Sequence, residues 1–168
     1  MHMFHDTLVS FAERRVISMT IHEAVKAYFE PKVGELVGDI LSFNFSPESR
    51  DSFALVTNYS GKIISEYVNG DKKKAYGFAI VIVKNYSTDG DDLNLQCMNF
   101  VQSFMEWLET QDRHKRYPVF PDNCKIEKME VLQNMPNLAG VNTESGLARY
   151  MVQCQITYKE IESDPLGL

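Results

Sequence analysis

The residues best suited to bind a metal are four histidines, and their spacing does not form a metal-binding motif. A zinc-binding helix needs two imidazoles on one face. His22-Glu23 begins such a pattern, but Lys26 stands where the second histidine is required. His2 and His5 are close enough in sequence to hold a metal weakly, although solvent-exposed histidines are the favoured interpretation, and His114 is isolated. We therefore expect no metal and no cofactor.

The candidate nucleophiles are three cysteines. A reactive thiol needs a positively charged, partly exposed setting that lowers its pKa. Cys97 lies on the apolar face of a predicted helix and Cys154 on the apolar face of a predicted strand, so core packing is expected for both. Cys124 is followed by Lys125, which leaves both interpretations open. An odd number of cysteines without a Cys-x-x-Cys pair favours reduced thiols in a reducing compartment.

Motifs for covalent or phosphate chemistry are missing from the sequence. It contains no Gly-x-Ser-x-Gly, Walker or Gly-x-Gly-x-x-Gly motif, and these are the patterns that position a serine nucleophile or a bound phosphate. We therefore expect that the chain is not an enzyme.

The composition is that of one globular domain. The chain has 168 residues, of which 44% are hydrophobic and 24% charged, and domains usually contain roughly 100–200 residues. Lys and Arg total 17 against 23 Asp and Glu, for a net charge of -6. Free-standing binding to nucleic acid is disfavoured, because the phosphates would repel the whole chain. No apolar run approaches the length of about 18 residues that a membrane span needs.

Two basic clusters are the strongest candidates for contact with a partner. Lys72, Lys73 and Lys74 follow Asn69-Gly70, and the alternatives are a solvated hairpin arm or a loop that touches an acidic partner or passing DNA. The run from Arg113 to Arg116 follows a predicted helix, and helix C-capping is the favoured alternative to a contact role. The candidate contact residues are Asn69, Gly70, Lys72, Lys73, Lys74, Arg113, Lys115 and Arg116.

The part of the chain before Pro47 has a helical pattern. Apolar residues three and four apart predict an amphipathic helix over 8–16. Thr20-Ile-His-Glu23 is typical of a capping box and predicts a second helix that ends before Pro31. The residues over 33–41 again have helical spacing.

The part after Pro47 alternates between strand and helix patterns. Phe53–Thr57 predicts a short strand. Ile63–Val68 and Lys72–Val83 flank Asn69-Gly70, which predicts a hairpin with a type I′ turn. Both faces of the second arm are apolar, so we expect this strand to be central and covered on both sides.

Further elements complete the expected sheet. Asp89–Asp92 opens the clearest helix, with an apolar stripe from Leu93 to Leu108. Lys125–Leu132 predicts a strand, and Asn134–Ser145 a loop. Arg149–Tyr158 alternates cleanly and predicts another strand.

The resulting prediction is an α+β domain, a mostly antiparallel sheet with helices packed on it. A helical segment over 1–46 is expected to pack on the same domain. Residues 47–160 form the predicted core, and 161–168 a flexible acidic tail.

Four stretches carry a resemblance to a known family. They are Val56–Gly61, Tyr76–Ile80, Phe104–Trp107 and Tyr150–Tyr158. Together with the order of the elements over Phe53–Tyr158, they resemble the tail terminators of long-tailed bacteriophages and phage-like particles, also known as tail-completion or minor capsid proteins.

The resemblance implies a structural protein of the virion tail or neck, assembled in the cytoplasm of the host bacterium. It implies a tail-terminator-like fold and a six-fold homo-oligomeric ring that caps the tail tube, stops tube polymerisation and joins the head connector. The expected partners are further copies of the chain, the tail tube protein and the head–tail connector or neck proteins. DNA is expected to pass transiently through the lumen, and no membrane is involved.

Ring assembly needs segments of the chain that become ordered when they bind a neighbouring subunit. We expect the loops Asp39–Ser52 and Asn134–Ser145 to be such segments. Lys72, Lys73 and Lys74 are expected on an assembly-facing hairpin, so reversing their charge is predicted to impair tail joining.

Two other functions stay open at this point. A neck or head-completion protein would bind the portal side instead of the tube. A small α+β enzyme or ligand-binding domain would show a concave pocket with converging polar groups, for example around Cys124 and His114.

Overall fold

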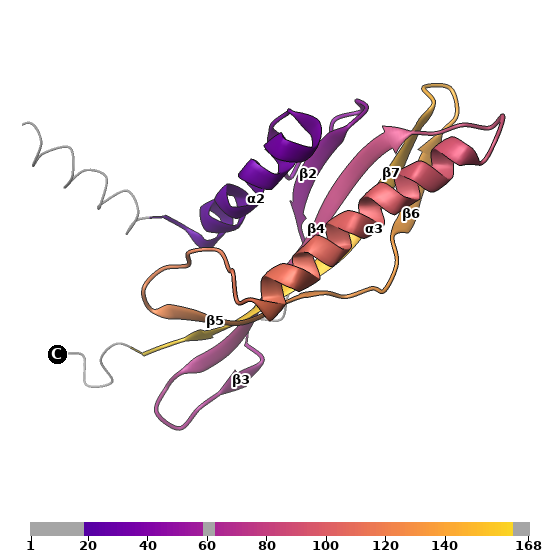
Figure 1. The fold of residues 1–168 in the computed structure, drawn as a ribbon. Helices are drawn as coiled ribbons and strands as arrows, with labels where there is room; N and C mark the ends of the chain where they lie inside the picture. The colour runs from indigo at the N-terminus through magenta and orange to yellow at the C-terminus, as the bar shows by residue number, and fades with distance from the viewer. Residues whose placement is uncertain (1–18, 59–62, 163–168) are drawn as a thin grey trace, which may run out of the picture.

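The computed structural model describes residues 19–58 and 63–162 (Figure 1). The helix predicted over 8–16 lies outside these residues. The described part contains two helices and a mostly antiparallel seven-stranded sheet, which confirms the predicted α+β class. Within this part, neither helix has the length and apolar character needed to cross a membrane.

Helix α2 (Ile21–Val37) begins with the predicted cap. The Glu23 amide donates to Thr20 Oγ1 at 3.2 Å, and the Thr20 hydroxyl donates to the Glu23 carboxylate, also at 3.2 Å. A side-chain acceptor at this position satisfies a donor that the first helical turn leaves free. The buried face of the helix consists of Ala24, Val25, Phe29 and Val33.

The predicted end of this helix before Pro31 is wrong, and the helical spacing over 33–41 does not form a separate helix, because residues 33–37 continue α2. Helix α2 passes through Pro31 without a break, because apolar residues on both sides of the proline pack into one core and outweigh the lost backbone donor. The helix ends where Gly38 takes a left-handed φ of 67° and donates its N–H to the Gly34 carbonyl at 2.9 Å. Leu41 then begins a strand.

Helix α3 (Asp92–Arg113) matches its predicted apolar stripe. Its buried residues include Cys97, Val101, Phe104, Met105 and Leu108. These positions recur every three or four residues, so one side of the helix faces the sheet while the other faces solvent.

The sheet is built around two long antiparallel strands, β4 and β7. The strand order is β1-β2-β4-β7-β5, with β3 paired to β4 and β6 paired to β7. All these pairs are antiparallel except β1 with β2. The bounds are β1 Leu41–Phe43, β2 Ser52–Thr57, β3 Ser65–Glu66, β4 Lys72–Asn85, β5 Cys124–Val131, β6 Asn137–Asn142 and β7 Leu147–Glu160.

Two strands lie where the sequence predicts none. β1 pairs in parallel with β2, so the expected boundary near residue 46 would cut through the sheet instead of separating a helical segment. β6 lies inside the expected loop Asn134–Ser145 and pairs with one end of β7. Neither strand offers the long alternation that predicts a half-buried strand, because β1 is short and β6 has no buried residue.

The core lies between the sheet and the two helices. Both helices pack on the same face of the sheet, against Phe53, Phe78, Ile80, Val152 and Ile156 (Figure 1). Aromatic rings meet at the centre of this layer, where Phe104 stacks on Trp107 with ring centroids 5.8 Å apart.

From Ala79 to Val83, the opposite face of β4 is also buried, as predicted for a central strand. Its residues Ala79, Val81 and Val83 are at most 4% exposed, yet among the described residues no helix lies on this face. At its far end the register places Arg149 of β7 beside Val83. The Arg149 side chain is within hydrogen-bond distance of Ser46 in the β1–β2 connection.

The hairpin around Asn69-Gly70 exists, but its turn is not type I′. That turn requires positive φ at both central residues, and only Gly70 has it, with φ 91°. The Gly70 N–H donates to the Tyr67 carbonyl at 2.9 Å, and the Tyr67 N–H donates to the Asp71 carbonyl at 2.8 Å. This pattern is a three-residue loop with a glycine bulge.

Candidate functional site

The predicted contact residues gather at one end of the molecule, which we call the hairpin end. It consists of the β3–β4 hairpin and the C-terminal end of α3, which lie near each other in Figure 1. Lys73 of β4 forms an ion pair of 3.8 Å with Glu127 of β5. The Tyr117 hydroxyl lies 3.5 Å from the Glu127 carbonyl oxygen and donates to Asp112 Oδ1 of α3 at 2.8 Å. A continuous set of contacts therefore links the hairpin to the helix end.

The three lysines of the hairpin differ in how their charges are satisfied. Lys74 Nζ lies 2.7 Å from Glu160 Oε2, and this hydrogen bond raises the pKa of the lysine. Lys73 is paired with Glu127 as described above. Within the described ranges, Lys72 has no ion pair or side-chain hydrogen bond. Its charge is the one of the three that stays available to a partner.

Asn69 and Gly70 shape the hairpin turn. The Asn69 side chain accepts from the Asp71 amide and donates to the Asp71 carboxylate, both at 3.2 Å. A Cβ at Gly70 would collide with the Glu162 carboxylate, and the positive φ would strain any other residue. Both residues thus have a structural role in the turn, whether or not the turn also touches a partner.

Asp71 ties the hairpin to the end of β7. Its buried carboxylate accepts from the Glu162 amide at 3.0 Å and pairs with Lys159 at 3.2 Å. The Glu162 amide, followed by the other donors, lowers the pKa of Asp71. Two residues of the predicted flexible tail are therefore held in place: Glu162 against the hairpin, and Ile161 by its N–H, which donates to the Asn123 carbonyl at 2.7 Å. Residues 163–168 lie outside the described residues.

The basic run after α3 forms the cap of that helix, as its favoured interpretation predicts. The Arg116 N–H donates to the Gln111 carbonyl at 2.9 Å, and the Lys115 N–H to the Asp112 carbonyl at 3.0 Å. These two bonds are the pattern of a Schellman cap. Lys115 takes the left-handed position with φ 53°, and Arg113 Nη2 donates to Thr110 Oγ1 at 2.9 Å.

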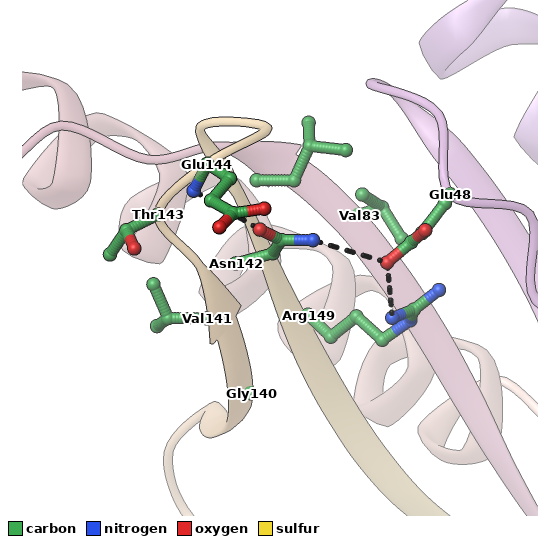
Figure 2. A pocket seen from close by; sticks show the side chains of 9 residues that line it. Glu48, Val83, Gly140, Val141, Asn142, Thr143, Glu144 and Arg149 are labelled. Atoms are coloured by element: carbon green, nitrogen blue, oxygen red, sulfur yellow. Dashed lines mark hydrogen bonds and ion pairs between the residues drawn. The ribbon is translucent and has the colours of Figure 1, made fainter.

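A second polar surface lies at the other end of the β4–β7 pair, and we call it the Arg149 end (Figure 2). Arg149 Nη2 donates to the Ser46 carbonyl at 3.3 Å, and Arg149 Nη1 lies 3.8 Å from Glu48 Oε1. Asn142 Nδ2 donates to the same Glu48 oxygen at 3.5 Å. The two segments predicted as assembly loops, Asp39–Ser52 and Asn134–Ser145, thus meet across the sheet.

A cavity of about 440 Å³ opens at this end. It is lined by Glu48, Val83, Gly140, Val141, Asn142, Thr143, Glu144, Leu147 and Arg149. Two carboxylates face one guanidinium, so the cavity can offer both donors and acceptors but carries no net positive charge. Sequence reasoning missed this site, since Arg149 appeared only as the first residue of a predicted strand.

The cysteines are not placed as nucleophiles. Burial raises the pKa of Cys97 and of Cys154, and the Cys97 thiol donates to the Asn85 carbonyl at 3.4 Å. Burial, and next the negative charge of Glu160, raise the pKa of Cys124. A thiol with a raised pKa is mostly protonated at neutral pH and attacks slowly. In the described part of the chain, no three His, Cys, Asp or Glu side chains gather as metal ligands would.

The two surfaces are far apart along the sheet. Lys73 and Val83 stand ten residues apart on β4, which corresponds to roughly 33 Å at the usual rise per strand residue. Figure 1 shows the β3 hairpin and β6 at opposite ends of the sheet. No family model and no curated protein matches the chain.

Proposed function

We propose that the chain is a structural subunit of a phage or phage-like tail terminator, forming a ring that caps the tail tube. The observation that carries this proposal is the placement of two different polar surfaces at opposite ends of the β4–β7 pair, roughly 33 Å apart. A subunit that stops a tube and also receives a connector needs two such surfaces. The resemblance stated above for Phe53–Tyr158 supports the same proposal.

The charges at both ends suit contacts that form during assembly. The ion pairs Lys73–Glu127 and Arg149–Glu48 are long, at 3.8 Å, and partly exposed. Such surface pairs are each worth about 0–1 kcal/mol, so a partner can replace them at little cost. We expect the side chains at each end to exchange their internal pairs for contacts with the tube on one side and the connector on the other.

The first test is the absolute mass of the purified chain in solution, measured by light scattering over a concentration series, with imaging of the particles. We expect a closed ring, or a monomer that forms a ring on purified tail tubes and stops their elongation. Absence of any binding to tubes, together with binding to the portal, would favour the neck or head-completion protein. Absence of both would contradict a role in tail assembly.

The cavity at the Arg149 end supports a second candidate, a ligand-binding domain. Its volume of about 440 Å³ falls in the range of small-molecule sites, roughly 300–1,000 Å³. Glycine and β-alanine are the probes, because the cavity offers the Arg149 guanidinium to a carboxylate and two carboxylates to an ammonium group. A rise in Tm with either probe that disappears in Arg149→Gln would support this candidate, and no rise at millimolar probe would oppose it.

A further inference from the structure

The described sheet has two open edges. Within residues 19–58 and 63–162, β1 at one edge pairs only with β2. At the other edge of this part of the chain, β5 and β6 follow each other along β7, and each pairs only with β7. An open strand presents unpaired N–H and C=O groups, which is a template for pairing with another chain.

Charges protect β5 but not β6. β5 carries Lys125, Glu127, Lys128 and Glu130 among its eight residues, and such charges discourage a further strand. β6 has no charged residue, and Leu138 and Val141 are 43% and 41% exposed. One half of this edge is therefore protected against pairing while the other half is left open.

The opposite edge has the same open character. β1 consists of Leu41–Phe43 and carries no charge. The residues on either side of it expose large apolar side chains, since Ile40 is 80% and Phe45 66% exposed. Exposed apolar groups beside an open strand are typical of a surface that becomes covered on association.

The two edges also match in length. A bulge between Leu138 and Gly140 interrupts β6 and leaves Gly140–Asn142 as a regular stretch of three residues. β1 is likewise three residues long. Side chains of paired residues share a face of the sheet, so Ser42 would lie opposite Gly140, and two residues of each regular stretch would overlap. Pairing them would bury no unpaired charge, whereas pairing at β5 would bury four charged groups near the interface.

We propose that β1 of one copy pairs with β6 of the next copy, so that the sheet continues from subunit to subunit. The two edges are different surfaces of the same molecule, so the contact is heterologous and generates a ring when its rotation closes. This inference rests on the proposed ring function and names the surfaces that would form the ring. A second copy is the occupant because the chain itself offers the complementary edge, with matching length and apolar flanks.

The sharpest test is a covalent bond across the contact. Ser42 pairs with Ala54, and Gly140 pairs with Arg149, so both positions point to the face of the sheet away from the helices. A Cβ at Gly140 meets nothing within 4 Å. We therefore choose Ser42→Cys with Gly140→Cys, in a Cys124→Ser background.

Within one subunit these two cysteines cannot bond. β2, β4 and β7 lie between the two strands, which places them about 19 Å apart at the usual strand spacing. A disulfide needs Cα atoms about 4.4–6.8 Å apart. Any bond must therefore link two copies.

On assembled material, oxidation of the double variant is expected to give a ladder of covalent multimers that collapses under reductant. Each single-cysteine variant is expected to give no ladder. As a second measurement, Val141→Lys is expected to weaken self-association at least tenfold. The matched control is Val119→Lys, because Val119 is 74% exposed but lies on neither edge, and this variant is expected to assemble like the wild type.

The possible failures can be told apart. If wild type assembles and caps tubes, yet the double variant forms no ladder and Val141→Lys assembles normally, the edge pairing is wrong and the ring function stands. If Val141→Lys loses tube binding while the double variant stays uncross-linked, β6 contacts another protein and pairing with a second copy is overturned. If wild type neither self-associates nor caps tubes, both proposals fall.

Discussion

At the scale of single residues, Asp71 makes the most specific prediction. Its carboxylate accepts from the Glu162 amide and pairs with Lys159, and these contacts lower its pKa from the ordinary 3.8. A carboxyl whose pKa is lower in the folded state stabilises the fold above its unfolded pKa and loses that effect as the pH falls through its folded pKa. We expect Asp71→Asn to have a lower Tm than the wild type at neutral pH. The difference in Tm between the two proteins is expected to narrow below about pH 4. Thermal melts followed by circular dichroism, at neutral pH and below pH 4, measure the difference in Tm. A difference that does not change with pH would contradict this role of Asp71.

Gln133 shows how one side chain can complete a sheet. It lies between β5 and β6, where it donates to the Met151 carbonyl at 3.0 Å and accepts from the Gln153 amide at 3.0 Å. Gln133→Ala is expected to reduce the free energy of unfolding by about 1–2 kcal/mol, because part-buried backbone groups of β7 lose their partners.

The matched control for this change is Gln155→Ala. Like Gln133, Gln155 is half-buried. It lies on β7, and its side chain makes no hydrogen bond within the described ranges. Gln155→Ala is expected to change the free energy of unfolding by less than about 0.5 kcal/mol. Urea unfolding of both variants measures the difference, and equal effects would show that Gln133 does not act as a backbone partner.

At the scale of elements, the end of α3 carries a strain that can be removed. Lys115 occupies the left-handed position of the Schellman cap with φ 53°, where a residue with a Cβ costs roughly 1 kcal/mol more than glycine. Lys115→Gly is expected to raise the free energy of unfolding by about 0.5–1 kcal/mol. Lys115→Ala keeps the Cβ and is expected to give no gain. If Lys115→Ala also raised the free energy of unfolding, the loss of the lysine charge, and not the loss of the Cβ, would explain the effect.

The elements that the sequence predicts best are those with one buried face. Buried residues recur every three or four positions along α3, and at every second position along most of β7. β1 and β6 were missed because their position depends on a neighbouring strand, and the continuity of α2 through Pro31 depends on packing against the sheet. The contacts of Arg149 could not be predicted either, since they join segments about a hundred residues apart in the chain.

At the scale of the whole molecule, we assign different binding partners to the two ends of the β4–β7 pair and to the two open edges of the sheet. The hairpin end and the Arg149 end are set apart along the strands. β6 borders the Arg149 end, whose cavity it lines with Gly140, Val141 and Asn142, and β1 lies at the opposite edge of the sheet. In a ring, edges bind neighbours while ends face the tube and the connector. A change at the hairpin end is therefore expected to leave ring formation intact, and so is Arg149→Gln, because Arg149 lies on β7, which is paired on both sides.

This division predicts two distinct assembly defects. Lys72→Gln removes the charge of the hairpin lysine that has no ion pair in the described residues, and Arg149→Gln removes the guanidinium of the other end. Glutamine is preferred to charge reversal at Lys72, because its cross-strand partners Glu66 and Glu160 would repel a carboxylate. We expect one variant to give overlong tubes, and the other to give tubes of normal length that are not joined to heads.

Electron microscopy of particles made with each variant measures tube length and the fraction of tails joined to heads. Lys26→Gln is the control, because Lys26 lies on α2 outside both surfaces, and its one ion pair among the described residues is with Glu30 in the next turn. It is expected to give normal particles. If both variants produced the same defect, the two ends would not serve different partners, and the placement of tube and connector on opposite ends of β4–β7 would have to be abandoned.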